Sequence, residues 1–366
     1  DDLVSFIKMR NEFAKKLGYP DYFTYMLKKE HKVDPEQLYA LLNDLETKTD
    51  SVYDRIKAQS DKKLADVFGI QPNELEPYHY DLLLDDNPKK EADKYIKSDD
   101  ELMSATFEMY KAMGWDLSAA GIQFDLFPRK NKNQHGFCFG IDSPGDTRIL
   151  ANLRNDMGSL ETLNHESGHA VYNIGISENL PYLDKDFASS TATEAVAMLM
   201  ETLPYREKVI LVKKFGMPTE LVERLDKKRK EELVSFVRSY LFYINFEKEL
   251  YKNPDQDIQK LWFDMRKKYA GKNPPLKLNN EWATVPHFLS HPAYLQNYLR
   301  AEIMAAQIYK AAAKQLGPLT QNTDTAEFFR QKMFRGGKSI TENEIMQAIT
   351  GDILKPDAFC EQIQDV

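Results

Sequence analysis

The pattern His-Glu-x-x-His at residues 165–169 is the first feature of the sequence that could do chemistry. It lies in a stretch, residues 159–176, whose apolar residues recur at the spacing of an α-helix. Four residues make slightly more than one turn, so His165 and His169 would project from one face and could bind one Zn²⁺. Glu166 could then act as general base on a metal-bound water that attacks a peptide carbonyl. The alternative is a pair of ordinary histidines on a helix.

A catalytic zinc needs three protein ligands and one open position, so a third ligand should lie elsewhere in the chain. Glu194 is the best candidate, because it lies in a second helical pattern, residues 189–203, that follows His169 after room for a loop. A carboxylate among small and apolar neighbours is costly to bury without a cation, which zinc would supply. Otherwise Glu194 would be an exposed residue near a helix start. Glu161, one turn before His165, could accept that imidazole's second N–H or simply be solvated.

A second set of reactive side chains lies in the segment 286–298. We predict a helix over 290–316, on which His291, Tyr294 and Tyr298 would share one face at positions i, i+3 and i+7. Attack on a peptide carbonyl creates an oxyanion, and a neutral donor such as a tyrosine hydroxyl or an imidazole would stabilise it. Taken alone, the same residues also fit core aromatics and a helix-cap histidine. Four of the seven histidines fall in the two segments, which favours a shared cleft.

The remaining patterns describe a mostly helical fold with a small antiparallel sheet. Short runs rich in aromatic and branched residues, 137–141 and 148–153, predict the strands, and the alternation in 136–140 suggests an edge strand that could pair with a peptide. The other apolar patterns have helical spacing. They predict helices at 3–17, 38–68, 102–113, 218–252, 255–270 and near 340–350, besides those already given.

With these motifs, the sequence resembles the zinc oligopeptidases of the gluzincin type, peptidase families M3 and M2, which include thimet oligopeptidase, oligopeptidase F and angiotensin-converting enzyme. The resemblance rests on residues 165–169, on Glu194 in a helix rich in small residues, on the His-plus-tyrosine segment 287–298, and on the stretch 9–19. It spans most of the chain and is most specific at the zinc motif.

The resemblance implies an elongated, mainly α, two-lobed metallopeptidase with a small sheet beside a channel that takes short peptides. By that analogy Tyr298 would donate to the oxyanion with His287 as second donor, and the strand with Phe137 and Phe139 would hold the peptide. Tyr294 would contact the substrate. The glycine-rich stretch that thimet-like members carry before their tyrosines is absent here, and the spacing to Tyr298 leaves open whether His287 or His291 is the donor. His291 is otherwise a substrate-binding candidate.

We expect residues 1–366 to form one catalytic region, with approximate lobes at 1–120 and 121–366 and without N-terminal helices of a longer precursor. The sequence begins at Asp1 with no initiator Met or signal peptide, which indicates a processed product or fragment. The compartment stays open between the cytoplasm and export with removal of a signal.

Composition excludes some partners. The net charge of −8 is spread through mixed-sign runs, which disfavours nucleic acid, and no apolar run is long enough to span a bilayer. Cys138 and Cys360 form neither a disulfide framework nor a CxxC pair. We expect a soluble monomer with one Zn²⁺ per chain and short peptides as substrates.

Two other functions compete with a zinc oligopeptidase or peptidyl-dipeptidase. One is a zinc exopeptidase of the carboxypeptidase or aminopeptidase type, which would need a residue that anchors a free chain terminus. The other is a non-catalytic, helical peptide-binding scaffold with a structural zinc. The presence of Glu166 argues against a scaffold, because a closed structural site has no need of a base.

Overall fold

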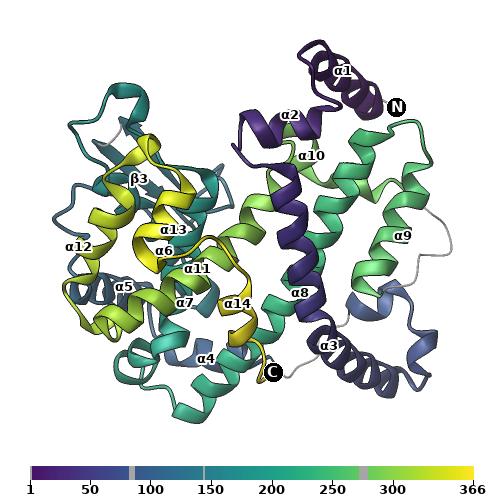
Figure 1. Ribbon diagram of the computed structural model, residues 1–366. Coiled ribbons are helices and arrows are strands. Elements are labelled where there is room, and N and C mark those ends of the chain that lie inside the picture. Colours follow the sequence, from purple (N-terminus) through teal and green to yellow (C-terminus); the bar gives the residue numbers. More distant parts are fainter. Residues whose placement is uncertain (1, 82–86, 143–144, 272–278) are drawn as a thin grey trace. The chain divides into compact units, whose positions relative to one another are not determined.

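The computed structural model describes residues 2–81, 87–142, 145–271 and 279–366, and it is mainly α-helical (Figure 1). The chain divides into two compact units that are not continuous in sequence. Unit 1 contains residues 1–85, 230–299 and 360–366, and unit 2 contains residues 86–229 and 300–359. The two lobes that we predict at 1–120 and 121–366, each continuous in sequence, stay a prediction.

Unit 1 is built from helices around an aromatic core. Asp34 caps the long helix α3 by accepting from the backbone N–H of Gln37, and Gly69 ends it in the left-handed conformation. The core includes Phe246 and Trp262, whose ring centroids lie 4.8 Å apart. The helices of this unit are α1 (Asp2–Lys16), α2 (Tyr22–Lys29), α3 (Pro35–Phe68), most of α8 (Thr219–Lys252), α9 (Ile258–Ala270), α10 (Pro286–Ser290) and the start of α11 (Leu295–Leu316).

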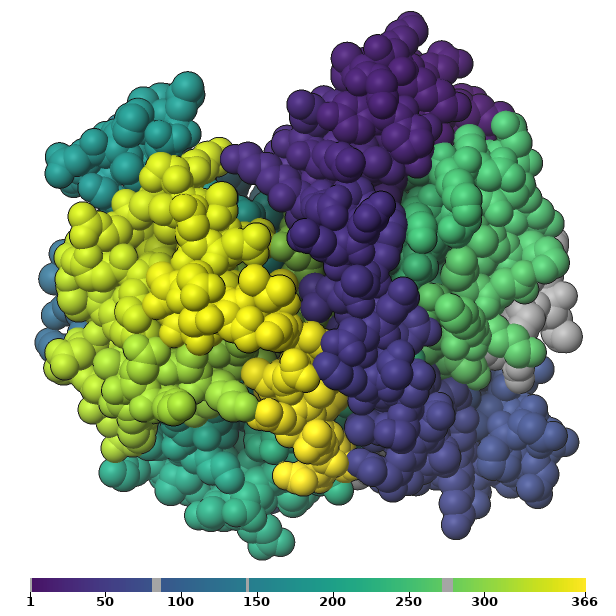
Figure 2. All heavy atoms as spheres, in the orientation of Figure 1, coloured from purple at the N-terminus to yellow at the C-terminus, as the bar shows by residue number. Residues whose placement is uncertain are grey.

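Unit 2 combines helices with the sheet. Its core includes Tyr172 and Phe334, whose rings stack at 4.6 Å. In the space-filling view, the segments of this unit after residue 300, coloured light green to yellow, form a continuous surface (Figure 2). The helices are α4 (Pro88–Ala92), α5 (Asp99–Ala112), α6 (Met157–Gly175), α7 (Ser190–Glu207), the start of α8, most of α11, α12 (Thr325–Phe329), α13 (Glu342–Thr350) and the first half of α14 (Asp357–Gln362).

The sheet of unit 2 has three strands in the order β1-β3-β2. Strand β2 (Phe137–Asp142) pairs antiparallel with β3 (Asp146–Leu150), as the sequence predicts. Strand β1 (Gln123–Asp125) adds to the other side of β3 in parallel, so the sheet is mixed rather than purely antiparallel. In the described part of the chain, β2 is an edge strand, with one side paired to β3.

The predicted helices form, with one important difference near residue 291. The helix predicted over 290–316 is interrupted: α10 ends at Ser290 and α11 begins at Leu295. Pro292 disfavours helical geometry at His291, which has φ −139° and ψ 70°, and Ala293 takes a left-handed φ of 58°. His291 and Tyr294 therefore precede the helix, and the prediction that they share a helix face with Tyr298 is wrong.

Within the described ranges, none of the helices combines the length and apolar character that a membrane crossing requires.

Candidate metal centre

Helix α6 positions the two histidines of the HExxH motif. Asp156 starts the helix by accepting from the backbone N–H of Ser159 at 2.7 Å. One turn separates His165 from His169, and their ring centroids lie 4.9 Å apart. The local sequence alone thus places both imidazoles on one side of α6.

Helix α7 brings Glu194 to the same place. The two helices pack side by side in unit 2 (Figure 1). Their close approach depends on Gly168, because a Cβ there would lie 2.7 Å from the Cα of Ala197 on α7. The Glu194 Oε2 atom lies 3.6 Å from His165 Nε2 and 3.8 Å from His169 Nε2.

These three side chains form what we call the metal cluster: His165, His169 and Glu194. Their possible ligand atoms all lie within 4.8 Å of one another, which suits a single ion. The outer nitrogens of the imidazoles are already engaged. His165 Nδ1 lies 2.9 Å from Glu201 Oε2, and His169 Nδ1 lies 2.7 Å from Thr193 Oγ1. Such partners fix the ring orientations and leave the Nε2 atoms on the side of Glu194.

Sequence reasoning missed Glu201 as the partner of His165. It considered Glu161, but that carboxylate pairs with Lys89 at 2.9 Å and accepts from the hydroxyl of Tyr205. A signal for Glu201 does exist in the sequence. Glu201 follows Glu194 by seven residues, which is two helical turns and places both carboxylates on one face of α7.

The electrostatics of the cluster suit a cation. Burial lowers the pKa of His169 to about 4, so this imidazole is neutral and able to donate a lone pair. Although burial disfavours a charged His165, hydrogen bonds to Glu194 and Glu201 raise its pKa well above the ordinary value. The carboxyl groups around the two imidazoles thus outnumber them, which favours a bound cation. The donor set of two imidazoles and one carboxylate fits a catalytic divalent metal.

Glu166 is buried next to the metal cluster, with 7% of its surface exposed. Burial raises its pKa to about 7, with the charges of Glu194 and Glu201 adding to the increase and His165 opposing it. A carboxyl group with this pKa can accept and return a proton near neutral pH.

Strand β2 packs against α6 through small residues. A Cβ at Gly136 would lie 3.2 Å from Glu166 Oε1, and one at Gly140 would clash with the Asn173 amide at 2.1 Å. Cys138 lies between these two glycines in the sequence. Burial raises the pKa of its thiol, and the nearby Glu166 adds to the increase. The small residues let the strand lie close to α6. Phe137 and Phe139 line a cavity of about 300 Å³ on the sheet.

The other predicted site residues lie in unit 1 and form what we call the His–Tyr cluster: His287, His291, Tyr294 and Tyr298. Tyr294 lies 5.3 Å from Tyr298 between ring centroids, and His287 lies about equally far from both tyrosines, at 6.1 and 6.0 Å. His291 lies 5.9 Å from Tyr294. The four rings therefore gather, although by a turn between two helices rather than along one helix.

The sequence model of peptidase family M3 matches residues 116–365, which is more than half of the chain and includes the metal cluster. The chain belongs to peptidase family M3. It is a metallopeptidase, as the resemblance in its sequence predicted, and its family implies a metal.

Solved structures of helical metallopeptidases share the M3 chain's fold. The chain matches metallocarboxypeptidase 1 of Trypanosoma cruzi with a TM-score of 0.71 and 15% identity, over 100% of this chain and 76% of that one. It matches the M32 carboxypeptidase of Deinococcus radiodurans R1 with a TM-score of 0.68 and 15% identity, over 99% and 73%. For PZ peptidase A with an inhibitor, the TM-score is 0.68 at 18% identity, over 99% and 63%.

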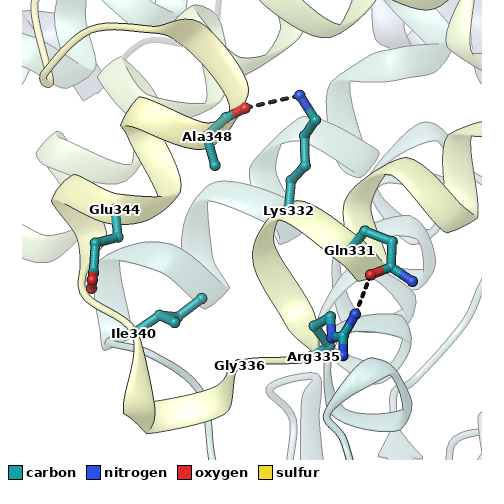
Figure 3. Close-up of a pocket in the computed structure, with 7 residues that line it drawn as sticks. All are labelled: Gln331, Lys332, Arg335, Gly336, Ile340, Glu344 and Ala348. Atoms are coloured by element: carbon teal, nitrogen blue, oxygen red, sulfur yellow. Dashed lines mark hydrogen bonds between the residues drawn. The ribbon is translucent and has the colours of Figure 1, made fainter.

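A second cavity of the M3-family chain, of about 490 Å³, lies between residues 331–336 and α13 (Figure 3). Lys332 Nζ donates to the carbonyl of Ala348 at 2.9 Å, and Arg335 donates to the side chain of Gln331. Glu344 accepts from Thr341 at the start of α13. The charged groups of this cavity thus serve the local fold, and its lining contains no member of the metal cluster.

Proposed function

We propose that this M3-family chain hydrolyses short peptides and that His165, His169 and Glu194 hold one zinc ion per chain. The observation that carries the proposal is the convergence of three ligand atoms from α6 and α7, with both outer imidazole nitrogens engaged and Glu166 buried beside them. A scaffold with a closed structural site would gain nothing from a buried base at that position.

The chemistry divides between the ion and the side chains. Zinc held by this donor set would polarise the scissile carbonyl and acidify a coordinated water. Glu166 takes the proton from the attacking water and passes it to the leaving amine. Glu201 and Thr193 keep the imidazoles oriented through their Nδ1 atoms during this exchange.

The substrate would bind as an extended strand beside β2. This strand lies at one edge of the sheet, and Gly136, just before it, approaches Glu166. Backbone pairing with a strand edge tolerates many sequences, which suits short peptides of varied composition. Phe137 and Phe139 would contact substrate side chains on the cavity side of the sheet.

The His–Tyr cluster would assist the reaction. Tyr298 would donate its hydroxyl to the oxyanion, with His287 or His291 as second donor, and Tyr294 would contact the substrate. Burial lowers the pKa of His287, and the neighbouring His291 adds to the decrease, so His287 is a neutral donor at physiological pH. These roles rest on the family resemblance and on the gathering of the four rings.

Release of single C-terminal residues is the second candidate, because two of the similar structures are named carboxypeptidases. Mass spectrometry of the products from one long peptide separates the two modes. Internal cleavage supports the oligopeptidase, whereas stepwise loss from the C-terminus supports a carboxypeptidase.

The first experiment measures metal content together with cleavage of a quenched fluorescent peptide, with and without a chelator. We expect one zinc per chain and chelator-sensitive cleavage that returns when zinc is added. Purified protein that neither contains nor binds a divalent metal would refute the assignment of the cluster.

A further inference from the structure

A buried carboxylate of unit 1 holds the backbone of the turn on which the His–Tyr cluster is built. Glu247 on α8 is 1% exposed, and its Oε1 atom accepts from the backbone N–H of Ala293 at 2.9 Å. Ala293 has a φ of 58°, a conformation that residues other than glycine rarely adopt. The hydrogen bond therefore stabilises a strained residue between His291 and Tyr294.

Arg10 on α1 contacts the start of the same turn, at the end of α10. Its guanidinium donates to the carbonyls of Phe288 at 3.1 Å and Leu289 at 2.6 Å, which lie at the C-terminal end of α10. It also donates to the Tyr251 hydroxyl at 3.0 Å, on the same helix as Glu247. A cation is well placed at a helix C-terminus, where backbone carbonyls lack partners. Figure 1 shows α1, α2 and α10 at the same end of unit 1.

His31 adds a third contact. Its Nδ1 atom accepts from the side-chain amide of Asn297 at 3.2 Å, which leaves the proton on Nε2. Nε2 lies 3.4 Å from the carbonyl of Pro292, so the ring donates there. His31 thus joins the turn to the first residues of α11.

Most of these contacts reach backbone atoms of residues 288–293 rather than side chains of the His–Tyr cluster. Burying a carboxylate with a single backbone donor is costly, and burial raises the pKa of Glu247 to about 8 against the N–H of Ala293 and the charge of Arg10. A turn that needed only to connect two helices could be made with glycine and without a buried acidic side chain. The contacts hold the backbone that connects His287 to Tyr298.

We infer that Glu247 and Arg10 are positioning residues, which hold the turn 288–293 so that Tyr298 keeps the geometry that hydrolysis requires. This inference rests on the proposed function of Tyr298. Neither residue takes part in the reaction itself, and both would affect the rate through the position of Tyr298.

The first test measures the turn directly. Glu247→Met removes the acceptor at similar volume, Glu247→Gln keeps an oxygen acceptor, and Glu249→Met removes a carboxylate two residues away that pairs with Lys252. We expect faster hydrogen exchange in peptides covering 288–297 for Glu247→Met, little change for Glu247→Gln, and none for Glu249→Met. Unchanged exchange in Glu247→Met would overturn the inference, whatever the activity of the variant.

The second test measures kcat, KM and metal content. We expect Glu247→Met to lower kcat by about 10- to 100-fold at unchanged metal content, because small displacements of catalytic groups are expensive. In a Tyr298→Phe background the same change should cost little more, since both act through one hydroxyl. An equal loss in both backgrounds would indicate general destabilisation and contradict the positioning role.

Arg10→Met provides a second route if Glu247→Met does not fold, because Arg10 is only partly buried. It should raise exchange at 288–291 and lower kcat in the same non-additive way. If Tyr298→Phe alone leaves kcat unchanged, the proposed role of Tyr298 fails, and the exchange experiment still decides whether Glu247 and Arg10 hold the turn.

Discussion

The metal cluster and the His–Tyr cluster are assembled in opposite ways. In the metal cluster, two candidate ligands come from one turn of α6 and the third from α7, the next α-helix in sequence. In the His–Tyr cluster, a broken helix carries the residues, and α1 and α8 hold its backbone from far away in sequence. We therefore expect changes in distant elements to disturb the His–Tyr cluster more than the metal cluster.

The largest expected effect is the loss of activity, without loss of the metal, when the base beside the metal cluster is removed. Glu166→Gln should lower kcat/KM by about 10²- to 10⁴-fold while one zinc per chain is retained, because the base is lost and the ligands stay. Peptide cleavage and elemental analysis measure the two quantities. Glu178→Gln, a surface change shortly after α6, is the control, and appreciable cleavage by the Glu166 variant would refute the mechanism.

The next effect tests the chemistry of the His–Tyr cluster. Tyr298→Phe removes one hydroxyl and should lower kcat by about 10²- to 10³-fold with KM little changed, as expected for a donor that acts on the oxyanion. Steady-state kinetics on one peptide measure both constants. Tyr240→Phe, whose ring lies 5.8 Å from that of Tyr298, should leave kcat near the original value. Equal losses in the two variants would remove the special role of Tyr298.

A smaller effect concerns the support of the metal ligands. Glu201→Gln should weaken zinc affinity by about 10- to 100-fold, because a neutral amide orients and polarises His165 less well than a carboxylate. Competition with a chromophoric chelator measures the affinity. Glu161→Gln is the matched control, since that carboxylate pairs with Lys89 and Tyr205 instead. A similar loss in both variants would argue against the contact to Glu201.

The smallest effect compares stability at two pH values. Burial raises the pKa of Glu302 in unit 2 to about 7, and the charge of Glu201 adds to the increase against Arg206 and Arg229. A raised carboxyl pKa stabilises the folded state below the unfolded value near 4.5, and this contribution is lost as pH rises through about 7. Glu302→Gln should therefore match the original protein at pH 4 and exceed it by about 1–3 kcal/mol at pH 8.

Urea unfolding at both pH values measures this difference, and Glu327→Gln, on an exposed and arginine-paired carboxylate, is the control. A Glu302 variant that is less stable at pH 8 would show that the ionised carboxylate is needed to balance Arg206 and Arg229.

The sequence by itself determined the helical fold, the HExxH helix and the candidate third ligand. These follow from the 3.6-residue period, which decides which side chains share a face before any tertiary contact forms. The seven-residue spacing from Glu194 to Glu201 could also have been recognised in the sequence. The parallel pairing of the three-residue strand β1 could not.

Only the tertiary structure decided which carboxylate holds His165 and how the His–Tyr cluster is built. Lys89 and Tyr205 engage Glu161, so Glu201 is the partner. At the turn containing Ala293, Glu247 and Arg10, both distant in the chain, hydrogen-bond to backbone groups. Such hydrogen bonds are set by packing and leave no period in the sequence, whereas two side chains on one face of a single helix do.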